Sequence, residues 1–241
     1  MAEPGRFRLR ELGVAIGTLP TGPLNAITDV PGVRVGHSTV SWGGPELPRG
    51  SGPARTGVTA VFPHADDLWH ERVVAGAHAA NGVGEVVGLS AIREWGLIET
   101  PILLTNSQSV GAVYDATVRW IMDRQPLAGI EDAVMPVVGE CDDGSLNDLR
   151  GMHVREEHVR AALDGASSGS VPEGCVGAGT GMTCFDFKAG IGTSSRIVTA
   201  HGRPWTVGVL SLANFGIRGR LSIDGVPVGR EIVDLMPLES R

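Results

Sequence analysis

The chain has 241 residues, 42% of them hydrophobic, and a formal net charge of −7 at pH 7, which together suit one domain over residues 1–241 with a substantial core. A negative chain without a basic stripe argues against nucleic-acid partners and against binding to an anionic membrane. Because no apolar run approaches the roughly 18 residues that span a bilayer, and the first residues lack the apolar core of a secretion signal, we expect a cytoplasmic protein.

The first third of the chain predicts short strands followed by helices. Apolar residues that alternate with polar ones, or run without interruption, predict strands over 33–40 and 58–62. The Gly- and Pro-rich residues 43–57 between them predict a loop. Acidic residues ahead of apolar patterns predict helices over 67–80 and 85–96.

A continuous apolar run predicts a buried strand over 101–105, which leads into a helix over 110–122. Polar residues at such a strand-to-helix junction either line a site or cap the helix. We assign helix capping to Ser109 and leave the role of Asn106 open.

The next predicted strand, over 133–138, ends in a stretch with four acidic residues among the nine from 140 to 148. That number would suit Ca²⁺, but the ligand pattern of a calcium loop is missing. We single out Glu140 as a carboxylate at the end of a buried strand. A functional role and a structural one, as an ion pair or helix cap, fit its spacing equally well. A helix over 156–165 follows.

Residues 176–196 are unusually rich in glycine. Because glycine weakens ordinary strands and helices, such density predicts backbone packed closely against backbone. The spacing matches neither a phosphate-binding loop nor a dinucleotide fingerprint, so nucleotide binding is not favoured. The glycines of this structural motif are Gly177, Gly179, Gly181, Gly190 and Gly192.

The strand predicted over 205–214 reads as buried and ends at Asn214, where a polar amide can serve chemistry. Asp224-Gly225 further along is a strong hairpin signal. The three cysteines have neither zinc-site nor disulfide spacing, and we expect neither a metal nor a cofactor. These cysteines are Cys141, Cys175 and Cys184.

Several stretches, in a fixed order, together resemble one family. They are NAITDVPGVRVGHSTV, RTGVTAVFP, NGVGE, PILLTNSQSVG, PVVGE, GAGTG, FKAGIGTSSR and VGVLSLANFG. From about Asn25 to about Gly229 the chain is similar to the L-aminopeptidase/D-esterase (DmpA-type) family of self-processing N-terminal-nucleophile hydrolases. That family includes β-peptidyl aminopeptidases and a pantetheine amidase. The resemblance implies an α/β fold, an αββα sandwich of two β-sheets between helical layers with its own connectivity.

The resemblance also implies how such a protein becomes active. Family members are made as one chain that cuts itself, and the new N-terminal Ser or Thr of the β chain becomes the nucleophile. This chain looks like the α chain, with the β chain from the same precursor as its partner and a homo-oligomer of αβ units as the expected assembly. None of its own serines, Ser240 included, stands where we would assign the nucleophile.

The site residues follow from the same resemblance. Asn214 matches the side-chain donor to the oxyanion, and Glu140 matches the carboxylate that holds the free amino group of a substrate. Asp142 stands where some members carry a tyrosine. Cys141 and Asn106 complete the candidate substrate-binding residues.

The implied function is hydrolysis of an amide bond in a small peptide or amide, of the aminopeptidase or amidase type. Two alternatives remain at the level of sequence. The first is a pantetheine-type amide hydrolase in antibiotic biosynthesis, and the second is a noncatalytic or unprocessed structural relative.

Overall fold

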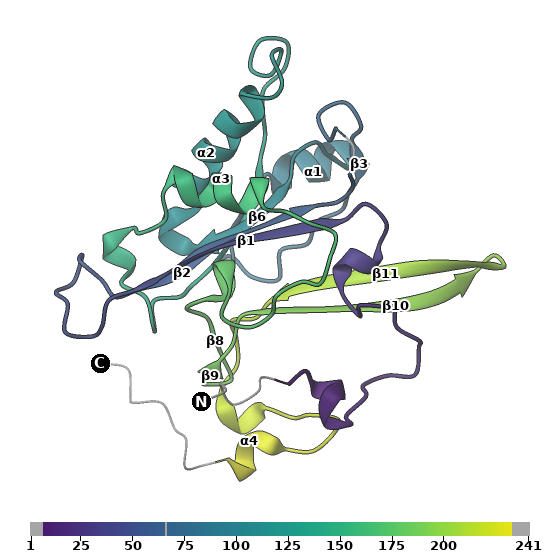
Figure 1. Ribbon diagram of the computed structural model, residues 1–241, viewed down its shortest axis with the longest axis vertical. Coiled ribbons are helices and arrows are strands. Elements are labelled where there is room, and N and C mark those ends of the chain that lie inside the picture. Colours follow the sequence, from purple (N-terminus) through teal and green to yellow (C-terminus); the bar gives the residue numbers. More distant parts are fainter. Residues whose placement is uncertain (1–6, 66, 233–241) are drawn as a thin grey trace.

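The computed structural model describes residues 7–65 and 67–232, and a mixed five-stranded sheet lies at its centre (Figure 1). Neighbouring strands of the sheet are antiparallel, except that β6 and β7 are parallel. The strands in spatial order are β1 (Arg34–Trp42), β2 (Ala54–Phe62), β6 (Ile102–Asn106), β7 (Val137–Cys141) and β4 (Val86–Val87).

Two helices, α2 (Val110–Met122) and α3 (Glu156–Asp164), cover one face of this sheet and form the main core with it (Figure 1). Their apolar residues recur at helical spacing, so each helix turns one stripe toward the strands. The fully buried members of this core include Val58, Leu103, Val113, Val138 and Val159.

A second layer is formed by the long hairpin of β10 (Ile191–Ala200) and β11 (Arg203–Leu212), which are antiparallel over ten residue pairs. The hairpin lies on the sheet side opposite to α2 and α3 (Figure 1). Leu210 packs there against a small cluster that contains Val35 and Val61. The described residues therefore form three layers in the order helix, sheet, sheet.

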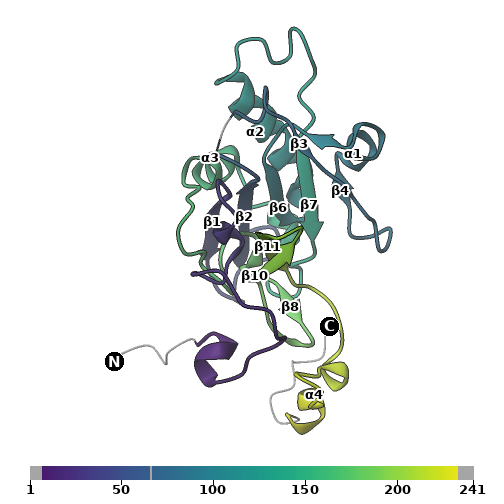
Figure 2. The same ribbon diagram turned by 90° about the vertical axis from the view of Figure 1, so that its right-hand side faces the viewer.

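The remaining elements are short. Figure 2 places α4 (Val228–Glu231) at the end of the molecule farthest from α2. The other short elements are α1 (Leu89–Trp95), the paired strands β3 (Val73–Val74) and β5 (Leu97–Ile98), and the paired strands β8 (Thr183–Cys184) and β9 (Phe187–Lys188). Single 3-10 turns are Leu9–Leu12, Ile27–Asp29, Ser107–Ser109, Leu149–Gly151, Gly177–Gly179 and Arg218–Arg220. No helix within the described ranges is both long and apolar enough to cross a membrane.

The helix predicted over 110–122 is confirmed with the same bounds, and the helix over 156–165 ends one residue early. The loop predicted over 43–57 is wrong in its last four residues, because β2 already begins at Ala54. Gly57 looked like a loop residue, but a Cβ there would contact the carbonyl oxygen of Gly177 at 2.5 Å. The strand needs glycine for that close approach.

The helix predicted over 67–80 is wrong. Asp67 accepts hydrogen bonds from the Trp69 amide at 3.0 Å and from His70 Nδ1 at 2.7 Å, which closes a single turn. The chain then pairs its two β-branched residues, Val73 and Val74, with β5. In the next predicted helix, 85–96, only the part from Leu89 is helical.

Two strand predictions also need correction. The strand predicted over 133–138 begins only at Val137, after a proline, and extends to Cys141. The strand predicted over 205–214 is β11, and it is not buried: Trp205, Val207 and Val209 are 56%, 50% and 53% exposed. The hairpin predicted at Asp224-Gly225 is confirmed only at its turn, where both residues have positive φ angles. It is joined by a single bridge between Ile223 and Val226 rather than by two strands, and α4 begins at Val228.

Candidate functional site

The candidate site lies where the ends of β7 and β11 meet, although these strands are about seventy residues apart in sequence. Asn214, two residues beyond β11, donates a hydrogen bond from Nδ2 to the carbonyl oxygen of Asp142 at 2.7 Å. The Cys141 Sγ lies 3.9 Å from the carbonyl oxygen of Leu212. The fold therefore brings Asn214 beside the segment that carries Glu140, Cys141 and Asp142.

The amide of Asn214 is held in one orientation. An amide nitrogen has two hydrogens, and the bond to the Asp142 carbonyl uses one of them. The same nitrogen lies 3.5 Å from the thioether sulfur of Met182, which is a weak acceptor. An oxyanion would compete easily for that second hydrogen, because charged acceptors form stronger hydrogen bonds.

Glu140 is half-buried at the end of β7, and its carboxylate is positioned from β6. The hydroxyl of Ser107, directly after β6, donates to Glu140 Oε2. Within the described ranges no basic side chain forms an ion pair with Glu140, so the structural ion-pair alternative lacks a partner there. Sequence reasoning missed Ser107, although its place at the strand-to-helix junction was a usable signal.

Asn106 is buried beneath the site, with 2% of its surface exposed. Its Oδ1 accepts a hydrogen bond from the Ser109 amide at 3.0 Å, and its Nδ2 donates to Thr56 Oγ1 at 2.6 Å. Asn106 thus caps the 3-10 turn Ser107–Ser109 that leads into α2. Ser109 takes the N-cap position of α2 but makes no capping bond with its side chain, so the capping role predicted for that side chain was wrong. Since both ends of the Asn106 amide are engaged inside the protein, its contact with a substrate stays a prediction.

Cys141 offers the site a half-buried thiol, and Asp142 offers it an exposed carboxylate. Burial, together with the charges of Glu140, Asp142 and Asp143, raises the pKa of the Cys141 thiol to about 11. The thiol is therefore protonated at neutral pH, which disfavours a nucleophilic role. The side chain of Asp142 is exposed and accepts a hydrogen bond from the Gly144 amide at 2.7 Å.

Asp143, which sequence reasoning did not single out, is fully buried next to the site. Burial raises its pKa to about 6, against the opposing effect of hydrogen bonds from Thr56 and Asn147. The Asn147 amide donates to Oδ1 at 2.9 Å, whereas Oδ2 has no hydrogen-bond partner among the described residues. The segment after β7 is thus anchored by a carboxyl group whose charge is costly.

The glycine motif packs as predicted at four of its five positions. A Cβ on Gly181 would overlap the carbonyl oxygen of Arg55 and come within 2.9 Å of the Asp143 Cβ. Gly190 has a φ of 141° and lies against the backbone of Gly174. Gly177 and Gly179 are similarly enclosed, whereas Gly192 faces open space. This packing sets Met182 beside the amide of Asn214.

The Ser and Thr residues that follow the glycine motif are engaged within the protein. Ser195 Oγ donates to Asp29 Oδ2 at 2.7 Å and accepts a hydrogen bond from the Gly22 amide at 3.0 Å. Although burial opposes it, the hydrogen bonds from Ser195 and nearby backbone amides hold the pKa of Asp29 below its usual value. Thr193 Oγ1 accepts a hydrogen bond from the Ile27 amide at 2.8 Å. These contacts fasten residues 25–29 to β10.

The acidic residues after β7 raise the question of a metal site. No group of three or more His, Cys, Asp and Glu side chains within the described part of the chain is arranged to hold a metal ion. The acidic residues after β7 instead form hydrogen bonds with backbone and amide groups, as Asp142 and Asp143 show. Ser240 lies outside the described residues.

Comparison with known proteins gives consistent matches. A family model described as Peptidase family S58 matches residues 25–237. The β-peptidyl aminopeptidase BapA of Sphingosinicella microcystinivorans is 46% identical over 235 residues, which cover 97% of this chain and 58% of that protein.

Two solved structures resemble the chain closely. The β-aminopeptidase of a Burkholderia species matches with a TM-score of 0.86 and 49% identity, over 94% of this chain and 62% of that one. The L-aminopeptidase D-Ala-esterase/amidase of Ochrobactrum anthropi, a variant of the N-terminal-nucleophile hydrolase fold, matches with a TM-score of 0.88 and 46% identity. That match covers 95% of this chain and 64% of the other.

These likenesses confirm the predicted α/β fold of the N-terminal-nucleophile-hydrolase type. They also bear on length: the chain spans 58% of the S. microcystinivorans protein and less than two thirds of each of the two solved chains.

Proposed function

This chain belongs to peptidase family S58, and we propose that it is the α chain of an amide-bond hydrolase of the aminopeptidase or amidase type, activated by cleavage of its own precursor. Its nucleophile is then the N-terminal Ser or Thr of a β chain from the same precursor.

The chemistry requires an oxyanion donor that is in place before reaction. The nucleophile's hydroxyl attacks the amide carbonyl and gives its proton to a base. The intermediate then expels the amine and leaves an acyl-enzyme, which water hydrolyses. Negative charge develops on the carbonyl oxygen during each attack, and a preorganised donor stabilises it. Asn214 fits this role because the Asp142 carbonyl fixes its amide while leaving the second hydrogen against a weak acceptor.

Glu140 supplies the second requirement, a means of choosing and orienting the substrate. A carboxylate held by Ser107 and free of described basic partners is suited to bind a substrate's terminal ammonium. Fixing that ammonium places the first amide bond of a peptide at a set distance from the anchor. This arrangement favours an aminopeptidase over an amidase whose substrate lacks an amine.

One observation carries the proposal: the fold joins Asn214 to the segment bearing Glu140 through a hydrogen bond of 2.7 Å between residues 214 and 142. A small amide or peptide is the proposed substrate. We further propose a homo-oligomer of αβ units and a cytoplasmic location, in line with the family membership.

The test is intact-mass analysis of the protein expressed from its complete reading frame, before and after incubation. Two masses are expected, with Ser or Thr as the first residue of the smaller fragment, together with hydrolysis of amino-terminal peptides or amides. A single uncut mass without hydrolysis would identify the chain as part of a noncatalytic relative and reject the proposal.

A further inference from the structure

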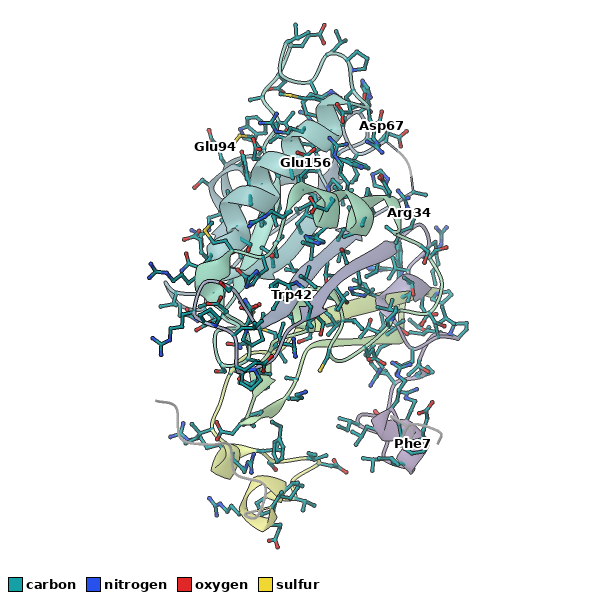
Figure 3. All side chains as sticks on the ribbon, turned by 60° about the vertical axis from the view of Figure 1, so that its left-hand side comes forward. Phe7, Arg34, Trp42, Asp67, Glu94 and Glu156 are labelled. Atoms are coloured by element: carbon teal, nitrogen blue, oxygen red, sulfur yellow. The ribbon has the colours of Figure 1, made fainter. Side chains whose placement is uncertain are left out.

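A cleft of about 840 Å³ opens next to the candidate site. Its walls are the loop 43–53 between β1 and β2, the segment 144–150 after β7, and strand β9. Trp42, labelled in Figure 3, marks the end of β1 where the first of these loops departs. No role described above uses this cleft.

The cleft is basic although the chain as a whole is negative. Four cationic side chains line it, and in the described part of the chain none of them forms an ion pair with an acid. Three of them are exposed, and one, Lys188, is the only lysine in the sequence. The four are Arg49, Arg55, Arg150 and Lys188.

The single acidic side chain in the lining is already engaged. Asp148 Oδ2 accepts hydrogen bonds from the amides of Gly50 and Gly52 at 2.7 and 2.9 Å, and lies 3.5 Å from His153 Nε2. The guanidinium of Arg55 donates only to backbone carbonyls, including that of Trp42 at 2.7 Å. The neutral amides of Gly50 and Gly52 leave the charge of Asp148 in place, so one negative charge faces four positive ones and the cleft keeps a net positive charge, which attracts an anionic group.

Residues that line the cleft adjoin the candidate site. Gly144, in the lining, donates its amide hydrogen to the side chain of Asp142, whose carbonyl holds Asn214. Thr180, also in the lining, lies two residues before Met182, which contacts the Asn214 amide. One end of the combined surface is acidic, at Glu140, and the other end is basic.

We propose that this cleft binds the carboxylate on the leaving side of the substrate, so that the preferred substrates are short peptides with a free C-terminus. The inference rests on the proposed function, because it assigns the ammonium to Glu140 and the scissile amide to Asn214. Arg49, Arg150 and Lys188 are all exposed and lack a described ion-pair partner. We assign most of the attraction to Arg150, on the segment after β7, and to Lys188, which also lines a pocket with Ala213, the neighbour of Asn214. Arginine also matches the planar geometry of a carboxylate.

The experiment uses the enzyme from the complete reading frame and two matched pairs of probes. The pairs are Ala-Ala with its C-terminal amide, and β-Ala-Ala with its C-terminal amide. Hydrolysis gives kcat/KM for each probe, and calorimetry on the Asn214→Ala enzyme, whose turnover is expected to be slower by about 10²–10³, gives each affinity. The test variant is Arg150→Gln with Lys188→Gln. The matched control is Arg93→Gln, which removes an exposed arginine on α1, outside the cleft.

We expect the free acids to bind about tenfold more tightly than the amides, as a few screened charge pairs would give. The double variant should abolish this preference and leave the amides unchanged, whereas Arg93→Gln should keep it. Equal binding of acid and amide, or a preference that survives in the double variant, would overturn the inference. Preferential binding of acids that are never hydrolysed would instead refute the proposed function and leave the cleft assignment standing.

Discussion

At the scale of single residues, the proposed function predicts that turnover depends most on Asn214. Asn214→Ala removes the donor that the Asp142 carbonyl holds in place. We expect kcat to fall by about 10²–10³ while KM changes little, because the lost bond forms only in the transition state. Steady-state kinetics measure this, and unchanged thermal unfolding shows that the variant folds. Undiminished turnover would remove Asn214 from the oxyanion site.

Glu140→Gln tests the ammonium anchor. The substitution keeps the shape and the acceptor for Ser107 but removes the charge, so kcat/KM should fall by at least tenfold for peptides with a free amine. Peptides with an acetylated amine, measured in parallel, should show no comparable loss. Ser107→Ala, which frees the carboxylate to rotate, should produce a smaller loss of the same kind. Equal losses for free and acetylated peptides would contradict the anchoring role.

The raised pKa of Asp143 predicts that the free energy of unfolding depends on pH in an unusual way. Its pKa is about 6 in the folded protein, above the ordinary value of 3.8, so the folded state binds the proton more tightly than the unfolded chain does. The charged carboxylate then costs about 3 kcal/mol above pH 6, a cost that disappears as the pH falls from 6 toward 4. His37 opposes this trend, because burial lowers its pKa to about 4 and its contribution is lost as the pH falls below 6.5.

Comparing Asp143→Asn with the parent protein isolates the aspartate, since His37 is present in both. The variant should be more stable to urea at pH 7.5, and its advantage should shrink between pH 6 and pH 4. An advantage that does not vary with pH would show that burial does not raise the pKa of Asp143.

At the scale of elements, the contact between residues 25–29 and β10 holds the second layer in place. Ser195 is 1% exposed and bonds to both Asp29 and Gly22. Ser195→Ala should lower the free energy of unfolding by about 1–3 kcal/mol, because the buried Gly22 amide loses its partner and the half-buried Asp29 carboxylate loses one of its donors. Urea denaturation measures the change. Ser211→Ala, an exposed position on β11, should change stability by less than about 0.5 kcal/mol. Equal effects of the two substitutions would show that this contact does not fasten β10.

Elements were predicted well where local pattern and tertiary packing agree. The apolar stripe of α2, with Val113 and Ile121 on its buried side, predicted both ends of that helix correctly. The helix expected over 67–80 failed because Val73 and Val74 gain more from pairing with β5 than from a helical turn. Acidic residues at its start could not reveal that distant partner.

At the scale of the whole molecule, β11 presents an apolar face that the described residues leave open. Trp205, Val207 and Val209 alternate along the strand, so they share one face, and each is about half exposed. Such a patch marks an interaction surface, and the proposed β chain is the partner we assign to it.

Val207→Asp should therefore impair assembly of the α and β chains, because a charge would be buried at their contact. Size-exclusion chromatography and the yield of assembled enzyme measure this. Val74→Asp, at a position 86% exposed on β3, is the matched control and should assemble normally. Normal assembly of Val207→Asp would show that this face is not covered by the partner chain.

By itself the sequence determined the fold class, the main helices, the tight packing of the glycine motif and the position of Asn214 at a strand end. These depend on local periodicity, on the conformational freedom of glycine and on motifs that resemble a family. Only the tertiary structure decided that Asn106 caps the 3-10 turn before α2 while Ser109 makes no side-chain capping bond, that Ser107 positions Glu140, and that Asp143 is buried with a raised pKa. It also decided that four separate cations line one cleft. The physical reason is that hydrogen bonds, burial and charge density depend on distances between residues far apart in the chain, which no local pattern records.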